Sequence, residues 1–501
     1  MLVSTPVYAD SYDLHNVAGT SYVTPVKEQG SYGTCWTFGT MASIESAILM
    51  DGLWLGPGTV PDLSENNLNN GSGFYPIPVD QGGDYRMSAA YLTRGGGPVY
   101  EVDDPYHNSS APITQPVHYY VRDIEWYSAG SDLSHMGDIK TALKSYGAVS
   151  TCIYWYGIYF NSATGSYYQP VADPNQPNHS VTIVGWDDSK VTKAAQPGAW
   201  LCKNSWGSAW NGNGYFWISY YDKFAGKDPE MGAVSFHNVV ANPYQRVYGY
   251  DEHGWASEKN YTHAANAYSA AEAGQLAAVG FYTTEKDVNY TIKVYQNFAN
   301  GQLDGLLSTK SGHMDFAGYH TLDLNERIAL ALGEDFYIAV QLDDGKQAVD
   351  MSVMKDVLMG ENSYSGYLVQ STSSPGESFY SVDGMTWSDL YYAQADHSAN
   401  FCIKALMLPE MCDSNNDHLI NGLDLGIWRR NYDPLGMHEN TFAMGDWNAD
   451  GLIDGVDLAL WQKHYRPTWQ ALENPEPATM LLVGTGVVGL LRRRRRDARR
   501  S

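Results

Sequence analysis

The chain has 501 residues, which is more than one hydrophobic core usually serves, so its length predicts several domains. Hydrophobic residues make up 44% of it and aromatic residues 13%, and this amount of apolar surface excludes a wholly disordered protein. The net charge of −25 argues against a nucleic-acid-binding protein and suits an exported, cation-binding one, while five cysteines are too few for a scaffold built from disulfides.

Cys35 stands at the start of a predicted helix. Residues 41–50 place Ile44, Ala47 and Ile48 at helical spacing, so the segment QGSYGTCW, residues 29–36, leads into the helix N-terminus. The partial positive charge there stabilises a thiolate, and a neighbouring imidazolium would lower the pKa of the thiol further. The pattern predicts that Cys35 is a nucleophile that attacks an acyl carbon.

Two later segments supply a base and a group to orient it. His179 precedes the apolar strand predicted at residues 181–186, and Asn204 lies in the segment KNSWG, residues 203–207. The Asn204 amide would hold the imidazole in one tautomer, and Trp206 would shield that hydrogen bond from water. Gln29 would donate to the developing oxyanion together with the backbone N–H of Cys35.

The order of these three segments, Cys35, His179 and Asn204, resembles the papain family of cysteine peptidases over residues 11–225. The resemblance implies an α+β fold, with a helical half and a β-barrel half, in which Cys35 and His179 face each other across a cleft that binds a protein or peptide substrate. It further implies that the glycine-rich edge at Gly82 and Gly83 pairs with the substrate backbone. Three more inferred features are substrate contacts at Ser180 and Trp206, a helix capped by Ser64, and catalysis without a cofactor.

The sequence departs from that family at several positions. Tyr32 replaces a cysteine that normally forms a disulfide, so the loops of the helical half are expected to be held by packing. Thr34 and Thr37 occupy positions usually taken by small residues. An inhibitory propeptide does not fit before Ser11, so we expect either that activity is controlled otherwise or that the start is truncated. Cys152 and Cys202 lie in predicted apolar strands and are expected to be inert.

Residues 238–408 read as an all-β domain that follows the peptidase at residues 1–237. Alternating stretches at 278–282, 290–295 and 336–342, separated by turn residues, predict an antiparallel sandwich. Residues 248–251, Gly254, Trp255 and residues 276–282 resemble the lectin-like domain that follows bacterial papain-like domains. The resemblance implies a carbohydrate partner, although such aromatic residues also cover cores and domain seams. Cys402 and Cys412 could pair in an oxidising compartment.

Residues 409–469 contain an internal repeat of oxygen donors, followed in each copy by an amphipathic run. Carboxylates, amides and a backbone carbonyl at this spacing bring oxygen ligands round one point, as Ca²⁺ requires. The pair resembles a type I dockerin, a small α-helical module, and implies two structural Ca²⁺ ions and a helical face that binds a cohesin. Two acidic surface turns are the alternative. The predicted ligands are Asp413, Asn415, Asp417, Leu419, Asn421 and Asp424 in the first loop and Asp446, Asn448, Asp450, Leu452, Asp454 and Asp457 in the second.

Residues 470–501 form a linker and a sorting segment. Pro475, Glu476 and Pro477 precede an apolar run at residues 480–491 and five arginines at 492–496. This order predicts an apolar transmembrane helix with a cytoplasmic basic end. It resembles the PEP-CTERM sorting signal, which an exosortase reads, and implies export to a Gram-negative envelope or extracellular matrix through a transient membrane anchor. A buried helix or a basic nucleic-acid tail would account for the run otherwise.

Three functions are consistent with these patterns. The first is an exported endopeptidase that acts through an acyl-enzyme on Cys35, with His179 as acid and base. The second is an inactive adhesin or scaffold with carbohydrate- and cohesin-binding modules. The third is a transglutaminase-like acyl transferase, which the Asn204 motif disfavours because those enzymes normally use an acidic third residue.

Overall fold

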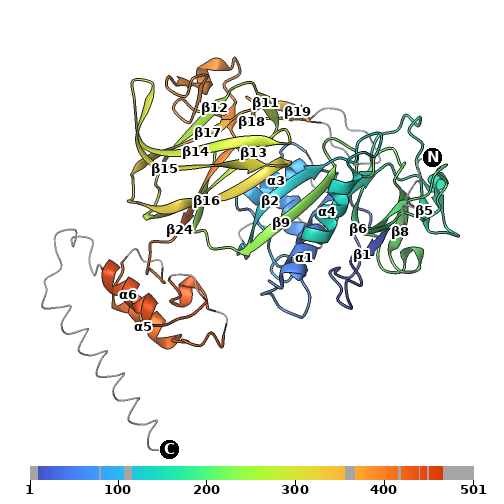
Figure 1. Cartoon of the computed structure of the whole chain (residues 1–501), viewed down its shortest axis with the longest axis horizontal. Helices are drawn as coiled ribbons and strands as arrows, with labels where there is room; N and C mark the ends of the chain where they lie inside the picture. Colours follow the sequence, from blue (N-terminus) through green and yellow to red (C-terminus); the bar gives the residue numbers. More distant parts are fainter. Residues whose placement is uncertain are drawn as a thin grey trace, which may run out of the picture. The chain divides into compact units, whose positions relative to one another are not determined.

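The computed structural model describes residues 10–77, 81–106, 115–355, 367–415, 419–438, 440–447 and 451–465. The described residues up to 408, apart from 273–275, form one compact unit. Those from 409 form a second unit together with 273–275. In the first unit, α1, α3 and α4 gather around the strands β2 and β9, and a strand-rich part lies beside them (Figure 1).

The first part of this unit mixes helices and strands. Its elements are β1 Ser11–Asp13, α1 Cys35–Asp51, α2 Glu65–Gly71, α3 Tyr85–Thr93, β2 Tyr119–Tyr127, α4 Met136–Tyr146, β3 Val149–Ile153, η1 Gly157–Tyr159, β4 Phe160–Asn161, β5 Ser166–Tyr167, β6 His179–Asp187, β7 Ala199–Lys203, η2 Trp210–Gly212, β8 Tyr215–Ser219 and β9 Ala233–Ala241.

Local sequence signals explain where the helices of this part begin and end. The helix expected over residues 41–50 is α1, which begins at Cys35 and is buried as far as Ile48. It ends where Gly52 adopts a left-handed conformation and donates its backbone N–H to the last carbonyls. Ser64 caps α2 by accepting from the N–H of Asn67, as predicted.

The second part of the unit is all-β. Its elements are β10 Arg246–Tyr248, β11 Ser257–Lys259, β12 His263–Ser269, β13 Gly274–Thr283, β14 Val288–Ala299, β15 Gln302–Met314, β16 Ala317–Leu330, β17 Asp335–Leu342, β18 Gln347–Asp350, β19 Val353–Lys355, β20 Tyr367–Val369, β21 Ser378–Ser381, β22 Ser388–Asp389, η3 Leu390–Ala393, β23 Asn400–Phe401 and β24 Ile403–Leu408.

Two sheets of this part pack face to face, which confirms the predicted sandwich. One sheet has the order β15-β14-β17-β12-β21-β22. Alternate residues along its strands, such as Ile292, Val294 and Val340, point into a common core. Side chains of β13, β16 and β24, among them Val279 and Met407, fill that core from the other side.

The two parts share a single sheet of thirteen strands within the described residues, in the order β10-β24-β13-β16-β2-β9-β3-β6-β7-β8-β5-β4 with β1 beside β6. Residues 317–320 of β16 pair antiparallel with residues 123–126 of β2, which joins the all-β part to the mixed part. The hydroxyls of Tyr120 and Tyr319 lie 2.8 Å apart across this seam, and both side chains are fully buried. The seam is therefore part of a continuous core.

The second unit contains two loop-and-helix copies with the helices α5 Gly422–Arg430 and α6 Gly455–His464 and the short η4 Phe442–Met444. Both predicted amphipathic runs are helical. Each helix starts in a capping box, formed by Asn421 with Asp424 and by Asp454 with Asp457. The two copies contact each other because Trp428 donates its indole N–H to the carbonyl of Asp454, and Trp461 donates to that of Asn421.

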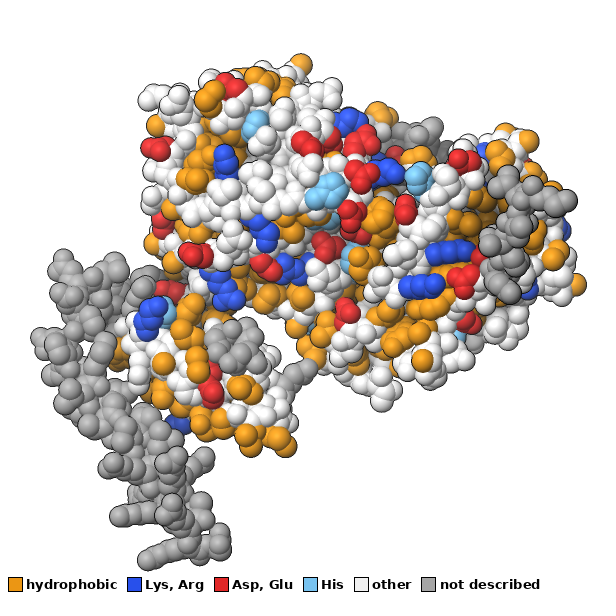
Figure 2. Space-filling view, in the orientation of Figure 1, with side chains coloured by type: hydrophobic (Ala, Val, Ile, Leu, Met, Phe, Trp, Pro, Cys, Tyr) orange, Lys and Arg blue, Asp and Glu red, His pale blue; other side chains and the backbone are white. Residues whose placement is uncertain are grey.

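Basic and acidic side chains are interspersed on the visible face of the protein. Lysine and arginine side chains lie singly or in small groups among acidic ones (Figure 2). Across the described ranges, no helix combines the length and apolarity needed to span a membrane. The predicted apolar helix and sorting segment at residues 470–501 lie outside the described residues, as do the predicted ligands Asp417, Asn448 and Asp450.

Candidate active site

Cys35 is the first residue of α1 and is only 3% exposed. The helix packs against β6, and the backbone amide of Ser180, the second residue of that strand, hydrogen-bonds the Cys35 thiol. His179 directly precedes Ser180 and is also 3% exposed. The fold therefore brings the helix N-terminus and the start of β6 together.

His179 is held by Asn204. Its Nε2 lies 2.7 Å from Oδ1 of Asn204. The backbone N–H of Ser205 also donates to this Oδ1, at 2.9 Å, which identifies the atom as the carbonyl oxygen. Because an oxygen acceptor requires a proton on Nε2, the Nδ1 atom of the neutral ring carries the lone pair. The ring of Trp206 stacks on the imidazole at 4.4 Å and covers this bond, as predicted.

Gln29 is fixed at both ends of its amide. Its Oε1 accepts from the hydroxyl of Ser205 at 2.6 Å, and its Nε2 donates to the carbonyl of Tyr32 at 2.7 Å. The amide nitrogen carries two hydrogens, so one of them is not used by the bond to Tyr32. Ser205 was not singled out from the sequence, although it directly follows Asn204.

Tyr106 binds the loop in which Tyr32 replaces the expected cysteine. Its hydroxyl lies 2.7 Å from the hydroxyl of Thr34 and donates to the carbonyl of Gln29 at 2.8 Å. Thr37 closes the same turn through its hydroxyl to the carbonyl of Thr34. All five cysteines carry free thiols, including Cys402 and Cys412. Hydrogen bonds and packing therefore hold the loop around Tyr32 in place of a disulfide.

Burial sets the protonation states of the site. It raises the pKa of the Cys35 thiol to about 11, although the backbone amides of Ser180 and Trp36 oppose this. It lowers the pKa of the His179 imidazole to about 4, although the bond to Asn204 opposes this. The thiol pKa thus moves opposite to the predicted lowering, because loss of hydration outweighs the hydrogen bonds from the backbone amides. At neutral pH the pair is a neutral thiol and a neutral imidazole.

A cluster of charged side chains, most of them buried, holds the segments that carry Gln29 and Asn204. No local sequence pattern predicted this cluster. Nζ of Lys27 lies within 3.0 Å of Glu45, Asp62 and Glu65. Burial alone would lower the pKa of Lys27, but these carboxylates raise it well above its ordinary value. Burial lowers the pKa of Lys203 to about 8. Lys203 donates to the hydroxyl of Thr24, which in turn donates to Glu45 of α1. Because Lys27 lies two residues before Gln29 and Lys203 directly precedes Asn204, these contacts anchor both segments to α1.

Three residues predicted to bind substrate, Gly82, Gly83 and Ser180, differ from one another in what they contact. Gly83 packs on the indole of Trp36, where an added Cβ would lie 2.4 Å from the ring, and Gly82 has a positive φ of 111°. This close approach explains the glycines. The hydroxyl of Ser180 bonds that of Tyr85 in the interior, while the backbone amide of Ser180 bonds the Cys35 thiol.

The loops of the second unit fit a divalent cation in part. Asp413, Asp424, Asp446 and Asp457 are at most 3% exposed. Burying carboxylates in this way costs free energy that a bound Ca²⁺ would offset. Asp424 and Asp457 each also accept two backbone N–H groups, which fixes their orientation. The donor set is hard oxygen throughout, as Ca²⁺ prefers.

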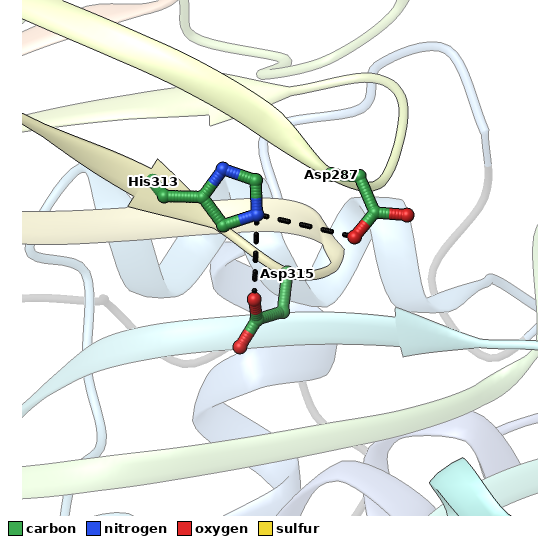
Figure 3. Close-up of side chains that lie close together, drawn as sticks. All are labelled: Asp287, His313 and Asp315. Carbon is green, nitrogen blue, oxygen red and sulfur yellow. Dashed lines mark ion pairs between the residues drawn. The ribbon is translucent and has the colours of Figure 1, made fainter.

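A different group of potential metal ligands lies in the all-β part. Nε2 of His313 is 3.4 Å from a carboxylate oxygen of Asp315 and 3.9 Å from one of Asp287 (Figure 3). His313 is 42% exposed and the two aspartates more so. Exposed polar side chains at such distances are common on a solvated protein surface.

Three segments match known protein families. Residues 8–231 match the family described as papain family cysteine protease, residues 247–407 the lectin like domain, and residues 475–496 the PEP-CTERM protein-sorting motif. A cathepsin L-like peptidase of Aedes aegypti is 32% identical over 197 residues, which are 38% of this chain and 54% of that protein. A viral cathepsin of Spodoptera litura multicapsid nucleopolyhedrovirus is 33% identical over 201 residues, 39% and 53% of the two chains. The chain thus spans about half the length of the curated relatives it matches.

Two solved structures resemble most of this chain. The cysteine protease Cwp84 after propeptide cleavage superposes with a TM-score of 0.67 at 26% identity, covering 80% of this chain and 99% of that one. The cysteine protease and lectin-like domains of Cwp84, a surface layer associated protein of Clostridium difficile, superpose with a TM-score of 0.67 at 25% identity, covering 80% and 89%.

Proposed function

We propose that this chain, whose residues 8–231 match the papain family of cysteine proteases, is an exported endopeptidase that hydrolyses peptide bonds through a covalent intermediate on Cys35. The observation that carries the proposal is the joint placement of three groups. Cys35 begins α1 against the start of β6, His179 bonds Asn204 through Nε2, and Gln29 is held nearby by Ser205.

The chemistry follows from the tautomer of His179. As the sulfur of Cys35 attacks the substrate carbonyl carbon, the thiol proton passes to Nδ1 of His179, and the imidazolium then gives a proton to the leaving amine. The C–N bond breaks and a thioester remains. Water, deprotonated by His179, attacks the thioester and releases the acid product and the thiol. Gln29 and the backbone N–H of Cys35 stabilise the oxyanion.

Three further roles complete the proposal. The PEP-CTERM motif at residues 475–496 supports export, with an exosortase as the sorting partner and a transient membrane anchor in the envelope. Cwp84, whose solved structure resembles this chain, is a surface layer associated protein, and this similarity supports an envelope location. The lectin-like part is a candidate for carbohydrate binding.

The second unit is a dockerin that binds two Ca²⁺ ions and a cohesin-type protein. The buried carboxylates of the two loops support the metal sites. Leu423 and Val456 occupy equivalent places in α5 and α6 and are 61% and 53% exposed. Two such apolar side chains on a symmetric pair of helices suit protein docking. When bound, Ca²⁺ would contribute structural charge and no catalytic step.

Labelling with an epoxide inactivator tests the peptidase role. The full chain should lose activity as one molecule of reagent attaches to Cys35, while the Cys35→Ala variant stays unlabelled. Cys152 and Cys202 serve as internal controls because both are fully buried in strands. Folded protein that resists labelling at neutral pH would contradict the peptidase role and favour the alternative of an inactive adhesin or scaffold.

A further inference from the structure

A cavity of about 430 Å³ lies between the two parts of the first unit. Phe74, Arg86 and residues 228–230 line it from the peptidase, and Trp255 and residues 353–355 line it from the lectin-like part. Both polar and apolar side chains reach into it. The cavity exists only because the two parts are joined.

A contact between Gly83 and Trp36 links the segment beside this cavity to the nucleophile. Gly83 packs on Trp36, the residue after Cys35, and Arg86 follows Gly83 by three positions. Nζ of Lys355 lies 2.5 Å from the carboxylate of Asp84, so the lectin-like part is fastened directly beside Gly83. Because Gly82 and Gly83 are the predicted edge that pairs with the substrate backbone, a peptide held at Cys35 would pass beside the segment that carries Asp84 and Arg86.

The cations of the cavity already have partners. The ammonium group of Lys355 is neutralised by its ion pair with Asp84. The guanidinium of Arg86 lies 4.4 Å from the centre of the Trp255 ring, where a cation–π contact stabilises its charge.

The two carboxylates that line the cavity, those of Asp228 and Glu230, differ in their hydrogen bonds. Asp228 accepts the backbone N–H groups of Glu230 and Met231 and so stabilises its own turn. The carboxylate of Glu230 makes neither a hydrogen bond nor an ion pair with any residue that the structure describes. Burial raises the pKa of Glu230 most, the charges of Asp84 and Asp228 raise it further, and those of Lys355 and Arg86 oppose this. Counting Asp84, three carboxylates face two cations here.

We propose that this cavity binds a basic side chain of the substrate, Lys or Arg, with the Glu230 carboxylate as its partner. The aliphatic stem of such a side chain would pack on Phe74 and Met354, which also line the cavity, while its charge reaches Glu230. The lectin-like part thereby acts in substrate selection. This inference rests on the proposed peptidase function, because the ligand is the peptide held at Cys35.

Binding to the full chain carrying Cys35→Ala tests the site without cleavage. The probes are amidated decapeptides of one sequence in which a single position carries Lys, Leu or Glu, scanned position by position and measured by fluorescence anisotropy. At one position we expect Lys to bind about 10-fold tighter than Leu, since a charge-assisted hydrogen bond is worth about that factor. Adding Glu230→Gln should remove the difference. The exposed residue Glu326 supplies the matched control, Glu326→Gln, which should keep it.

Two outcomes would overturn the proposal. One is that Lys binds no tighter than Leu at any position. The other is that the preference for Lys is as large in the Glu230→Gln variant as in the Glu326→Gln control. A failure of the proposed peptidase function can be distinguished from a failure of the cavity proposal. If the chain with Cys35 intact cleaves none of the peptides while the Cys35→Ala variant binds Lys peptides through Glu230, the site stands and the catalytic proposal falls. Cleavage without any preference for Lys overturns the cavity proposal and leaves the peptidase function standing.

Discussion

Gln29 is held in place by a side chain that does no chemistry itself. Its amide oxygen accepts from Ser205, and its nitrogen keeps a hydrogen beyond the one given to Tyr32. Replacing Gln29 by Ala removes one oxyanion donor and should lower kcat by about 100- to 1000-fold. Ser205→Ala keeps the amide of Gln29 but removes the hydrogen bond that orients it, so the loss of kcat should be smaller. Steady-state kinetics on one peptide substrate measure both variants, and equal losses would contradict a donor role for Gln29.

The pH dependence of catalysis should report the burial of His179. The imidazole must be neutral to take the thiol proton, and burial lowers its pKa from an ordinary value near 6.5 to about 4. Activity should therefore persist as the pH falls from 7 to 5 and be lost as it falls through about 4. The measurement is kcat/KM against pH, with circular dichroism at each pH to show that the protein stays folded. Loss of activity already near pH 6.5 would show that His179 is solvated.

At the scale of elements, the pairing of β2 with β16 is the joint that holds the peptidase and lectin-like parts together. Gly318 lies in that joint, where an added Cβ would lie 2.1 Å from the backbone oxygen of Ile124. A backbone atom in a paired strand cannot move aside cheaply, so no other residue fits without separating the strands.

The variant Gly318→Ala should destabilise the folded protein by about 1–3 kcal/mol, the usual cost of overpacking. Urea unfolding of the full chain measures this as a lower midpoint. Gly157→Ala is the control, because its added Cβ meets no atom within 4 Å and the residue is exposed. A midpoint for Gly318→Ala equal to that of the control would mean that the seam is not tightly paired.

At the scale of the whole molecule, the two compact units should respond differently to loss of calcium. We expect chelation to unfold residues 409–465, because the buried carboxylates of Asp413, Asp424, Asp446 and Asp457 would then repel one another without a cation. The core of the first unit involves none of these residues. Calorimetry with and without chelator should therefore show one transition shifted down and one unchanged.

Titration with Ca²⁺ should give two sites in the full chain and one in the Asp457→Ala variant. A chain that binds no Ca²⁺, or whose two thermal transitions move together, would contradict the dockerin assignment. Asp454→Asn is a milder variant that keeps the shape of the helix cap, and we expect it to weaken one site without abolishing the fold.

The sequence alone determined the features that depend on short stretches of chain. The helix at Cys35, the Ser64 cap, the alternating strands and the two loop-and-helix copies follow from local spacing and hydrogen bonding, which do not need distant residues. The motif around Asn204 likewise predicted its bond to His179 and the cover provided by Trp206.

Only the tertiary structure decided what depends on burial and on pairing between distant segments. The neutral state of Cys35 and His179, the cluster of Lys27 and Lys203 with its carboxylates, and the joining of β2 to β16 could not be read from the sequence. Desolvation and strand pairing are set by groups that lie far apart in the chain and meet only on folding, so no local pattern records them. The same reason applies to Glu230, which gains its surroundings from two different parts of the first unit.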